Sequence, residues 1–539
     1  MLRRTICKLK KLNGNFNGEC CDDIPSMLKT TETLKYRMIG YSMVIGVITG
    51  MVVCSYRILG DYFLHFFKHN VEKYHNNPIA IIVMFSVLSI MAIFVAQCVK
   101  AEPNISGSGI PQVEGTITRR MQTNWKKILI FKYLGGLVSL AGGLSVGREG
   151  PSVQIGAAIG EGISKQTNKM DYEHKYLITS GAAAGLAAAF NAPLAGVMFA
   201  LEEAHKNFSP IVLMSAMVAA LSSDAITKSF LGLQPSLWFK EFYTMPIKYY
   251  WSLILLGIVI GCSSWFFNNG ILKSKKLYRK LPIKIEYKIL IPFIFSGLVG
   301  LFFPLMLGGG HTVIINIDKL NYGVIALISI AIFKYLFTFI SFSSGVPGGI
   351  FFPLLAIGTL LGASVGTFCI KYLHIPHIYL INFAVFAMAG NFAAIVKAPI
   401  TGIVLVFEMT GSLEHLLPLA LVVFVAMIVS DLLGVHPIYD QLLEDILSSG
   451  KHEYKGEKDK KTLVELTVCL ESMVDGKKLS EVKWPENCLV VSIDRGDTEI
   501  IPRGCTRMLE GDRLTIMVNQ TESARMLDQL TQLICIEKI

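Results

Sequence analysis

The sequence predicts an all-α polytopic membrane protein that ends in a small α+β domain. Three observations predict this fold class: long uncharged apolar segments, a duplicated set of glycine and proline motifs, and a change of composition near residue 450. The 539-residue chain is 52% hydrophobic and only 17% charged, whereas soluble proteins are about 25% charged. The composition therefore excludes an ordinary soluble globular protein.

Several uncharged runs are long enough to cross a hydrocarbon core of about 30 Å as helices. The clearest are Met38–Tyr56, Ile79–Val99, Tyr176–Leu201, Trp251–Leu272 and the long run Tyr335–Ile370. The basic N-terminal stretch MLRRTICKLKKLNG lacks the apolar segment of a secretory signal. We therefore expect residues 1–36 to form a cytoplasmic arm.

The distribution of Lys and Arg predicts the orientation in the cell membrane. Within a net charge of +10, basic residues gather at the N-terminus, around Arg119–Lys127 and in residues 272–288. By the positive-inside rule these segments, and with them both termini, face the cytoplasm. The 11 cysteines lack the spacing of a metal site or a disulfide framework, so we expect them to be reduced and structural. We expect neither a metal nor a cofactor.

An internal repeat organises the membrane part. Residues 147–160 and 349–362 share glycines and a proline, with Gly147 recurring 202 residues later as Gly349. Residues 191–203 and 397–409 form a second pair, in which Glu202 recurs 206 residues later as Glu408. Two ordered blocks at nearly equal offset indicate homologous halves, about 37–240 and 250–445, within a membrane domain 37–445.

The glycine and proline blocks also predict where polar chemistry occurs. Breaks in a spanning helix survive where the freed backbone groups line a cavity, and a helix N-terminus there presents N–H groups to an anion. Three glycine-rich helix starts fit this description: SGSGIPQ (106–112), GREGP (147–151) and SGVPGGIFFP (344–353). Together they predict an anion site within the membrane, although each glycine taken alone is also compatible with close helix packing.

Four segments resemble the signature motifs of the CLC family of chloride channels and proton-coupled chloride transporters. They are GSGIPQ (107–112), GREGP (147–151), GGIFFP (348–353) and the late tyrosine of HPIYDQLL, Tyr439. The resemblance implies two inverted-topology repeats with short broken helices around a mid-membrane anion site. It also implies a homodimer with an independent pore in each subunit.

The resemblance assigns roles to individual residues. The hydroxyls of Ser108 and Tyr439 and the amides of Ile350 and Phe351 would hold the central anion. The amides of Gly147, Arg148, Glu149 and Gly150 would hold an outer anion, and Ser108 fits chloride-selective members. Glu149 matches the external gating glutamate, whose carboxylate competes with the anion until it is protonated.

Two further charges lie in apolar surroundings. A buried Arg normally has a partner, and for Arg148 we expect this partner to be Glu114, with a smaller role for Arg148 in setting the local field. Lys132 is a lone charge in FKYLGG, where it would raise the potential near the pore.

Glu203 separates an exchanger from a passive channel. In FALEEAHKNF it aligns with the internal proton-accepting glutamate of the family's antiporters, and Glu202 before it would hydrate or position the proton route. By residue type alone, an ordinary solvated glutamate is the alternative. The resemblance therefore favours exchange of chloride for protons, with a passive gated chloride channel as the alternative function.

An enzyme is disfavoured, because the sequence holds no HExxH motif and no Asp or His pair within the predicted spans. His374 and His377 have a proline between them and no further ligands nearby, so a loop is expected there. Nothing in the sequence indicates a nucleic-acid partner; the expected partners are chloride, protons, membrane lipid and a second copy of the chain.

The C-terminal part forms a second domain. Residues 446–461 read as a charged linker. In 462–539, LVELTVCL, NCLVVSIDRG, TEIIPRG and DRLTIMVN read as strands and ESARMLDQLTQLI as a closing helix. This part resembles a TrkA-C (RCK C-terminal) regulatory domain, which implies a small ligand such as a cyclic dinucleotide, or dimerisation without a ligand.

Overall fold

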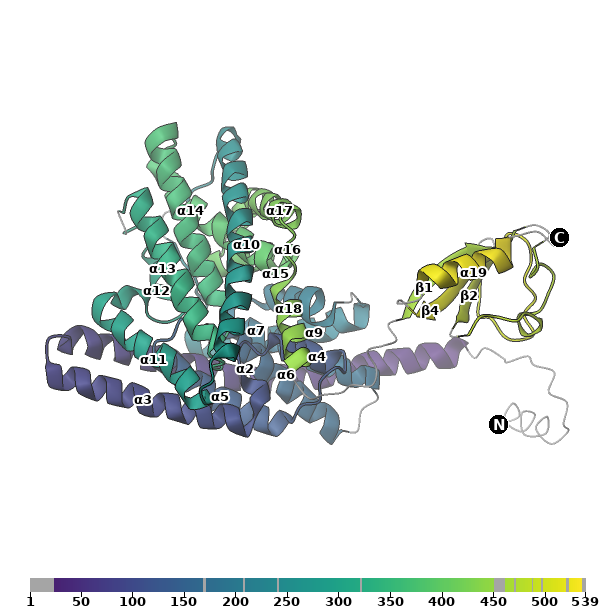
Figure 1. The fold of residues 1–539 in the computed structure, drawn as a ribbon, viewed down its shortest axis with the longest axis horizontal. Helices are drawn as coiled ribbons and strands as arrows, with labels where there is room; N and C mark the ends of the chain where they lie inside the picture. Colours follow the sequence, from purple (N-terminus) through teal and green to yellow (C-terminus); the bar gives the residue numbers. More distant parts are fainter. Residues whose placement is uncertain are drawn as a thin grey trace. The chain divides into compact units, whose positions relative to one another are not determined.

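The computed structural model describes two parts of the chain. The first is residues 24–449 without 168–170, 207–208, 240–241 and 320–321; the second is residues 461–535 without 470–471, 487, 496–497 and 520–522. Contacts divide the chain after Ser449 into a helical unit and a small α+β unit (Figure 1). Most of the predicted N-terminal arm (1–36) and of the charged linker (446–461) lies outside the described residues.

The helical unit repeats one order of helices twice. Its first half contains α2 (Ile24–Tyr74), α3 (Pro78–Ala101), α4 (Ile110–Ile117), α5 (Trp125–Ala141), α6 (Glu149–Gln166), α7 (Asp171–Phe190), α8 (Pro193–Phe199) and α9 (Pro210–Leu231). Its second half contains α10 (Tyr250–Lys280), α11 (Ile285–Phe302), α12 (His311–Ile315), α13 (Val324–Ser343), α14 (Phe351–Leu373), α15 (Leu380–Val396), α16 (Pro399–Thr410), α17 (Leu416–Leu432) and α18 (Ile438–Ser449). The helices α4 to α8 match α12 to α16 in order, which supports the predicted repeat.

The chain is a multi-pass membrane protein. Within the described residues, nine helices are long and apolar enough to cross a membrane. Two predicted spans are wrong as single helices. The run Tyr176–Leu201 divides into α7 and α8, because Pro193 cannot continue a helix and Asn191 turns the chain with φ 55°. The run Tyr335–Ile370 divides into α13 and α14 at the glycine-rich segment before Phe351.

Some of the duplicated glycines serve packing alone. A Cβ at Gly156 of α6 would lie 2.1 Å from the carbonyl oxygen of Gly181 in α7, and a Cβ at Gly160 would lie 2.2 Å from that of Leu177. The second half repeats this contact, because a Cβ at Gly362 of α14 would lie 2.3 Å from the carbonyl oxygen of Phe383. Close packing therefore explains these glycines, which lie within the helices and not at their starts.

The C-terminal unit is a four-stranded antiparallel sheet covered by one helix. The strands β1 (Lys461–Thr467), β2 (Leu489–Arg495), β3 (Thr498–Ile500) and β4 (Arg513–Asn519) have the order β1-β4-β2-β3. Helix α19 (Ser523–Cys535) packs on the sheet (Figure 1), and its Leu530 and Ile534 are buried in one cluster with Leu514 and Ile516. The predicted strands and closing helix are confirmed.

A buried carboxylate ties β2 to the turn before β4. Asp512 accepts hydrogen bonds from Nε and Nη2 of Arg495, both at 2.7 Å, and from the amide of Leu509 at 2.9 Å. Burial alone would raise the pKa of Asp512, but these hydrogen bonds outweigh it and lower the pKa below its usual value. The pair therefore stabilises this unit above the ordinary pKa of aspartate, and the contribution is lost as the pH falls through the lowered pKa.

Replacing Asp512 with Asn removes this contribution at neutral pH. We expect the unit to lose about 1–3 kcal/mol, nearer the lower figure because Arg495 is partly exposed. Hydrogen exchange of the β4 amides in the full-length protein measures the loss. Asp494→Asn, which changes a nearby acid of β2 that forms no ion pair with Arg495, serves as the control; equal exchange in both variants would contradict the assignment.

Candidate anion-binding site

The three glycine-rich segments meet through backbone hydrogen bonds. The amide of Gly147 donates to the carbonyl of Gly349 at 2.6 Å, and the amide of Gly349 donates to the carbonyl of Gly147 at 2.7 Å. Gly107 likewise donates to Val346 at 3.1 Å and accepts from Gly348 at 3.0 Å. Gly147 and Gly349, equivalent in the repeat, thus pair with each other, and together with the Gly107 bonds this brings the starts of α4, α6 and α14 together.

Two hydroxyl groups lie at this junction. Ser108 precedes α4 and Tyr439 lies in the first turn of α18; both are buried and their hydroxyls are neighbours. Neither hydroxyl makes a hydrogen bond of ordinary geometry with the protein. Buried donors of this kind are normally satisfied, so the pair is available to an acceptor such as an anion.

Glycine at position 150 keeps this space open. A Cβ there would lie 2.5 Å from Oγ of Ser108, and a Cβ at Gly349 would lie 3.0 Å from the amide nitrogen of Gly150. Beside them α14 begins at Phe351 after Ile350, so its first amide groups have no partner within the helix. The structure therefore brings Ser108, Gly150, Ile350, Phe351 and Tyr439 to one place.

The Glu149 carboxylate is fully buried at the start of α6. It lies among the amide groups of Arg148, Glu149 and Phe352, yet neither oxygen makes a hydrogen bond of ordinary geometry. A Cβ at Gly147 would lie 2.1 Å from Oε2 of Glu149 and 3.2 Å from the amide nitrogen of Phe352. Gly147 must therefore lack a side chain for the carboxylate to occupy this position.

Arg148 pairs with Asp61, so the expected partner Glu114 is wrong. Nη1 of Arg148 donates to both carboxylate oxygens of Asp61, at 2.7 and 2.6 Å, and the guanidinium carbon lies 5.6 Å from the ring centre of Phe352. The reason is the length of α2, which continues well past the predicted end of the first span at Tyr56. This extension carries Asp61 to the segment that precedes α6.

Replacing Asp61 with Asn leaves the largely buried Arg148 charge without its carboxylate. We expect the stability of the protein to fall by about 1–3 kcal/mol, because the cost of burying the Arg148 charge is then no longer offset by a carboxylate. Because Asp61 is half exposed, we expect a smaller loss of stability than for a fully buried ion pair. The thermal unfolding midpoint in detergent measures the change, with Asp318→Asn, an exposed acid, as the control. An unchanged midpoint for Asp61→Asn would contradict a stabilising pair.

Lys132 holds the first glycine-rich segment by its carbonyls. Its fully buried ammonium donates to the carbonyls of Ile105 and Gly107, both at 2.7 Å. Sequence reasoning missed its counterpart, Lys334, which donates to Met306 at 3.0 Å and to Gly308 at 2.6 Å. The repeat offset of 202 residues between Lys132 and Lys334 could have found it.

Glu203 is buried and lies at the end of α8. It belongs to a π-helical turn, Ala200–His205, and its Oε1 has no partner. The ammonium of Lys206, three residues later, hydrogen-bonds Glu114 at 2.7 Å and also Asp440 on α18. Glu114 therefore belongs to a charged cluster beside Glu203. Asp440 of this cluster follows Tyr439 in the first turn of α18. The alternative of a solvated glutamate does not apply.

Glu202 points to the other half of the repeat. Its Oε2 accepts from the amide of Thr401 at 2.8 Å and from the Thr401 hydroxyl at 2.7 Å, at the start of α16. Its counterpart Glu408 accepts from the amides of Leu194 and Ala195 at the start of α8, at 3.1 and 2.8 Å. Each glutamate thus caps the helix of the other half, and Glu202 ties the turn that carries Glu203 to the start of α16.

The fold and the site define a class of membrane protein: two homologous helical halves that bring helix starts, buried hydroxyls and one carboxylate together at one junction. The family model described as voltage gated chloride channel matches residues 90–431, and the TrkA-C domain model matches residues 463–531. The chain belongs to the voltage gated chloride channel family. The predicted family and the predicted C-terminal domain are confirmed.

Relatives and solved structures agree with this assignment. The H(+)/Cl(-) exchange transporter ClcA of Vibrio parahaemolyticus is 35% identical over 380 residues, which cover 69% of this chain and 81% of that protein. ClcA of Vibrio campbellii is 36% identical over 356 residues, covering 65% and 76%. The crystal structure of a slow cyanobacterial Cl−/H+ antiporter, 29% identical, superposes with a TM-score of 0.73 and covers 77% of this chain and 99% of that one.

Proposed function

We propose that the protein exchanges chloride for protons across the cell membrane. The observation that carries this proposal is the Glu149 carboxylate, which is buried among amide groups at a helix start without a fixed partner. Such a pocket suits any small anion, including a halide ion. The similarity to two ClcA proteins described as H(+)/Cl(-) exchange transporters supports chloride and protons as the two substrates.

In this proposal the carboxylate and chloride take turns. While Glu149 is charged it occupies the outer anion position between Gly147 and Phe352. Protonation removes the charge, so the side chain loses its attraction to the amide groups and leaves the position to an anion. The hydroxyls of Ser108 and Tyr439 and the amides of Ile350 and Phe351 then hold the central anion. No residue with a full charge is needed at the central position, which favours release of the ion.

Glu203 serves as the inner proton relay. Its burial and its unpartnered oxygen support a group that exchanges a proton with Glu149 through the protein, while the Lys206 cluster provides a polar boundary on the other side. A passive channel needs no such acid. The exchanger is therefore preferred to the channel, which uses the same fold.

The assembly and the tail complete the proposal. The termini face the cytoplasm, by the distribution of basic residues, and two copies form a homodimer with one pathway in each. The TrkA-C domain acts as a cytoplasmic regulatory module for a small ligand such as a cyclic dinucleotide. Such a ligand changes transport only if its affinity differs between active and inactive states.

Paired electrodes test the function in liposomes loaded with chloride. A potassium ionophore dissipates the membrane voltage and so allows chloride to leave the liposomes through the purified protein. We expect protons to enter in a fixed proportion to the chloride that leaves. Protein-free liposomes are the control. Chloride efflux without proton uptake would establish the channel and overturn the exchanger.

A further inference from the structure

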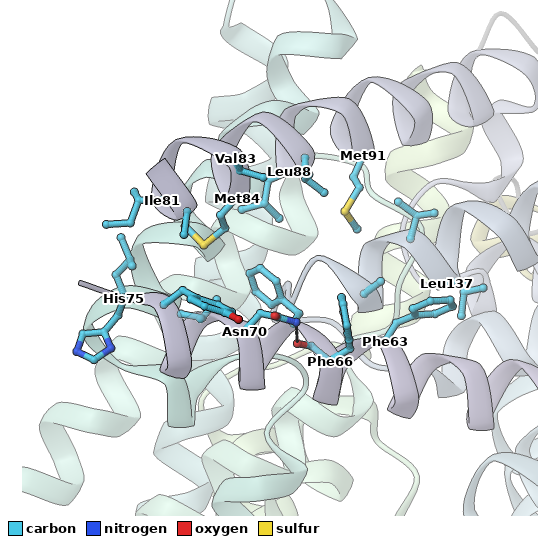
Figure 2. Close-up of a pocket in the computed structure, with 18 residues that line it drawn as sticks. Phe63, Phe66, Asn70, His75, Ile81, Val83, Met84, Leu88, Met91 and Leu137 are labelled. Carbon is cyan, nitrogen blue, oxygen red and sulfur yellow. Dashed lines mark hydrogen bonds between the residues drawn. The ribbon is translucent and has the colours of Figure 1, made fainter. Parts of the chain in front are cut away.

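A large apolar cavity lies between α2 and α3 and shares no lining residue with the anion site. It has a volume of about 700 Å³ and is lined by residues of α2, α3, α5 and α11 (Figure 2). Most of its wall consists of Phe, Met, Leu and Val side chains, among them Phe63 and Phe67 of α2, Met84 and Met91 of α3, and Leu137 of α5. The cavity therefore offers a continuous hydrocarbon surface.

Water is a poor occupant of this cavity. The polar side chains of its wall, Asn70, Tyr74 and His75, lie at the end of α2 and in the turn after it. The amide of Asn70 already donates to the carbonyl of Phe66 at 2.8 Å, and Nδ1 of His75 pairs with the carbonyl of Glu72 at 2.8 Å. A buried water needs two to four polar partners, and an empty space of this size forfeits dispersion contacts along its walls. The occupant must be apolar.

The cavity opens toward membrane lipid. Exposed apolar side chains continue its walls over the outer surface, namely Phe66 on α2 and Ile79 and Ile82 on α3. A dry cavity of about 150 Å³ already holds benzene, so this volume accommodates a much longer hydrocarbon. A transmembrane helix would pack closely on small residues, whereas these walls consist mostly of large, adaptable Phe and Met side chains.

A lysine and a histidine lie at one end of the cavity, beside the exposed acid Glu72. Lys73 lies with its ammonium 5.1 Å from the ring centre of Tyr74, which lines the cavity, and His75 stands at the end of the cavity (Figure 2). The turn between α2 and α3 places these residues where two spanning helices end, at the level of lipid headgroups. Basic residues at this level attract anionic lipids.

We propose that the cavity binds one acyl chain of an anionic phospholipid, whose phosphate lies at Lys73 and His75. The chain enters between α2 and α3 and reaches Ala141, the last residue of α5. Phe67 of the cavity also packs on Gly143, since a Cβ there would lie 3.0 Å from its ring. The lipid thus contacts the helix end from which the chain leads to Arg148 and Glu149. This inference does not depend on the proposed transport function.

Photoreactive phospholipids test the proposal with the full-length protein in liposomes. Two probes carry the same diazirine-bearing acyl chain, one on phosphatidylglycerol and one on phosphatidylcholine, and mass spectrometry maps the labelled residues. We expect the label to concentrate at Phe63–Phe67 and Met84–Met91, several-fold more with phosphatidylglycerol. Label spread evenly over lipid-facing helices such as α10 would overturn the site, and equal label from both probes would overturn the headgroup assignment.

Matched tryptophan variants separate the cavity from the surrounding surface. Ala80→Trp and Ala141→Trp each place a large side chain inside the cavity, at two different positions, while Ile90→Trp adds the same side chain to an exposed position of α3 outside it. We expect several-fold less label at Met84–Met91 in either cavity variant and unchanged label in Ile90→Trp. Unchanged label in both cavity variants, with the proteins still monodisperse in detergent, would overturn the proposal.

Discussion

Replacing Glu149 with Gln abolishes proton transport and leaves chloride flux in place. The amide has the shape of the carboxylate but carries no negative charge, so the amide groups of Arg148, Glu149 and Phe352 no longer attract it. Chloride then enters the outer position without competition. Because the side chain cannot gain or lose a proton, the flux also becomes independent of pH.

Chloride and pH electrodes on liposomes measure both parts of this result. Proton uptake should fall to the level of protein-free liposomes, while chloride efflux persists at every pH from acid to neutral. Glu72→Gln, which neutralises an exposed acid of α2, is the matched control and should keep coupled transport. Uphill proton transport by the Glu149→Gln protein would show that another group carries the proton on the outer side.

Replacing Glu203 with Val should also stop proton transfer, but in this variant the anion pathway keeps its gate. Val is apolar and fits a buried position, while the anion donors Ser108 and Tyr439 remain in place. The outer carboxylate still competes with chloride, so the chloride flux should remain dependent on pH. This dependence distinguishes the variant from Glu149→Gln.

The same liposome assay, run at several pH values, provides the measurement. Glu202→Gln is the matched control at the neighbouring position, because its amide oxygen can still accept from the Thr401 amide on α16; coupled transport should persist. If the Glu203→Val protein still transported protons uphill, Glu203 would not be the inner proton relay. Loss of chloride flux along with proton flux would indicate a structural role instead.

Sequence reasoning predicted most of the fold because its signals are local. Apolar runs mark the spans, and the paired motifs at Gly147 and Gly349 mark the two halves. The breaks were harder to place: Tyr176–Leu201 reads as one span by hydropathy, since Asn191 is the only strongly polar residue before Pro193. Hydropathy averages over this break, whereas backbone geometry depends on the single proline.

The candidate site was also only partly predictable from the sequence. Ser108, Glu149, Ile350, Phe351 and Tyr439 lie in recognisable motifs and were predicted to converge. The partner of Arg148 was not, because Asp61 lies 87 positions away on a helix whose length the sequence does not reveal. Contacts between distant helices depend on their packing, which no local pattern encodes. Lys334 was missed for a different reason: Lys132 and Lys334 share the repeat offset but lie outside the two duplicated blocks that reveal the repeat.

Anomalous diffraction from crystals grown in bromide tests most directly whether Glu149 and a halide share one position. We predict that the wild-type protein holds the carboxylate between Gly147 and the amide of Phe352, with bromide only at the central position beside Ser108 and Tyr439. In the Glu149→Gln protein, a second bromide peak should occupy the place of the carboxylate. An outer position without bromide in the variant would contradict the exchange of places on which this account depends.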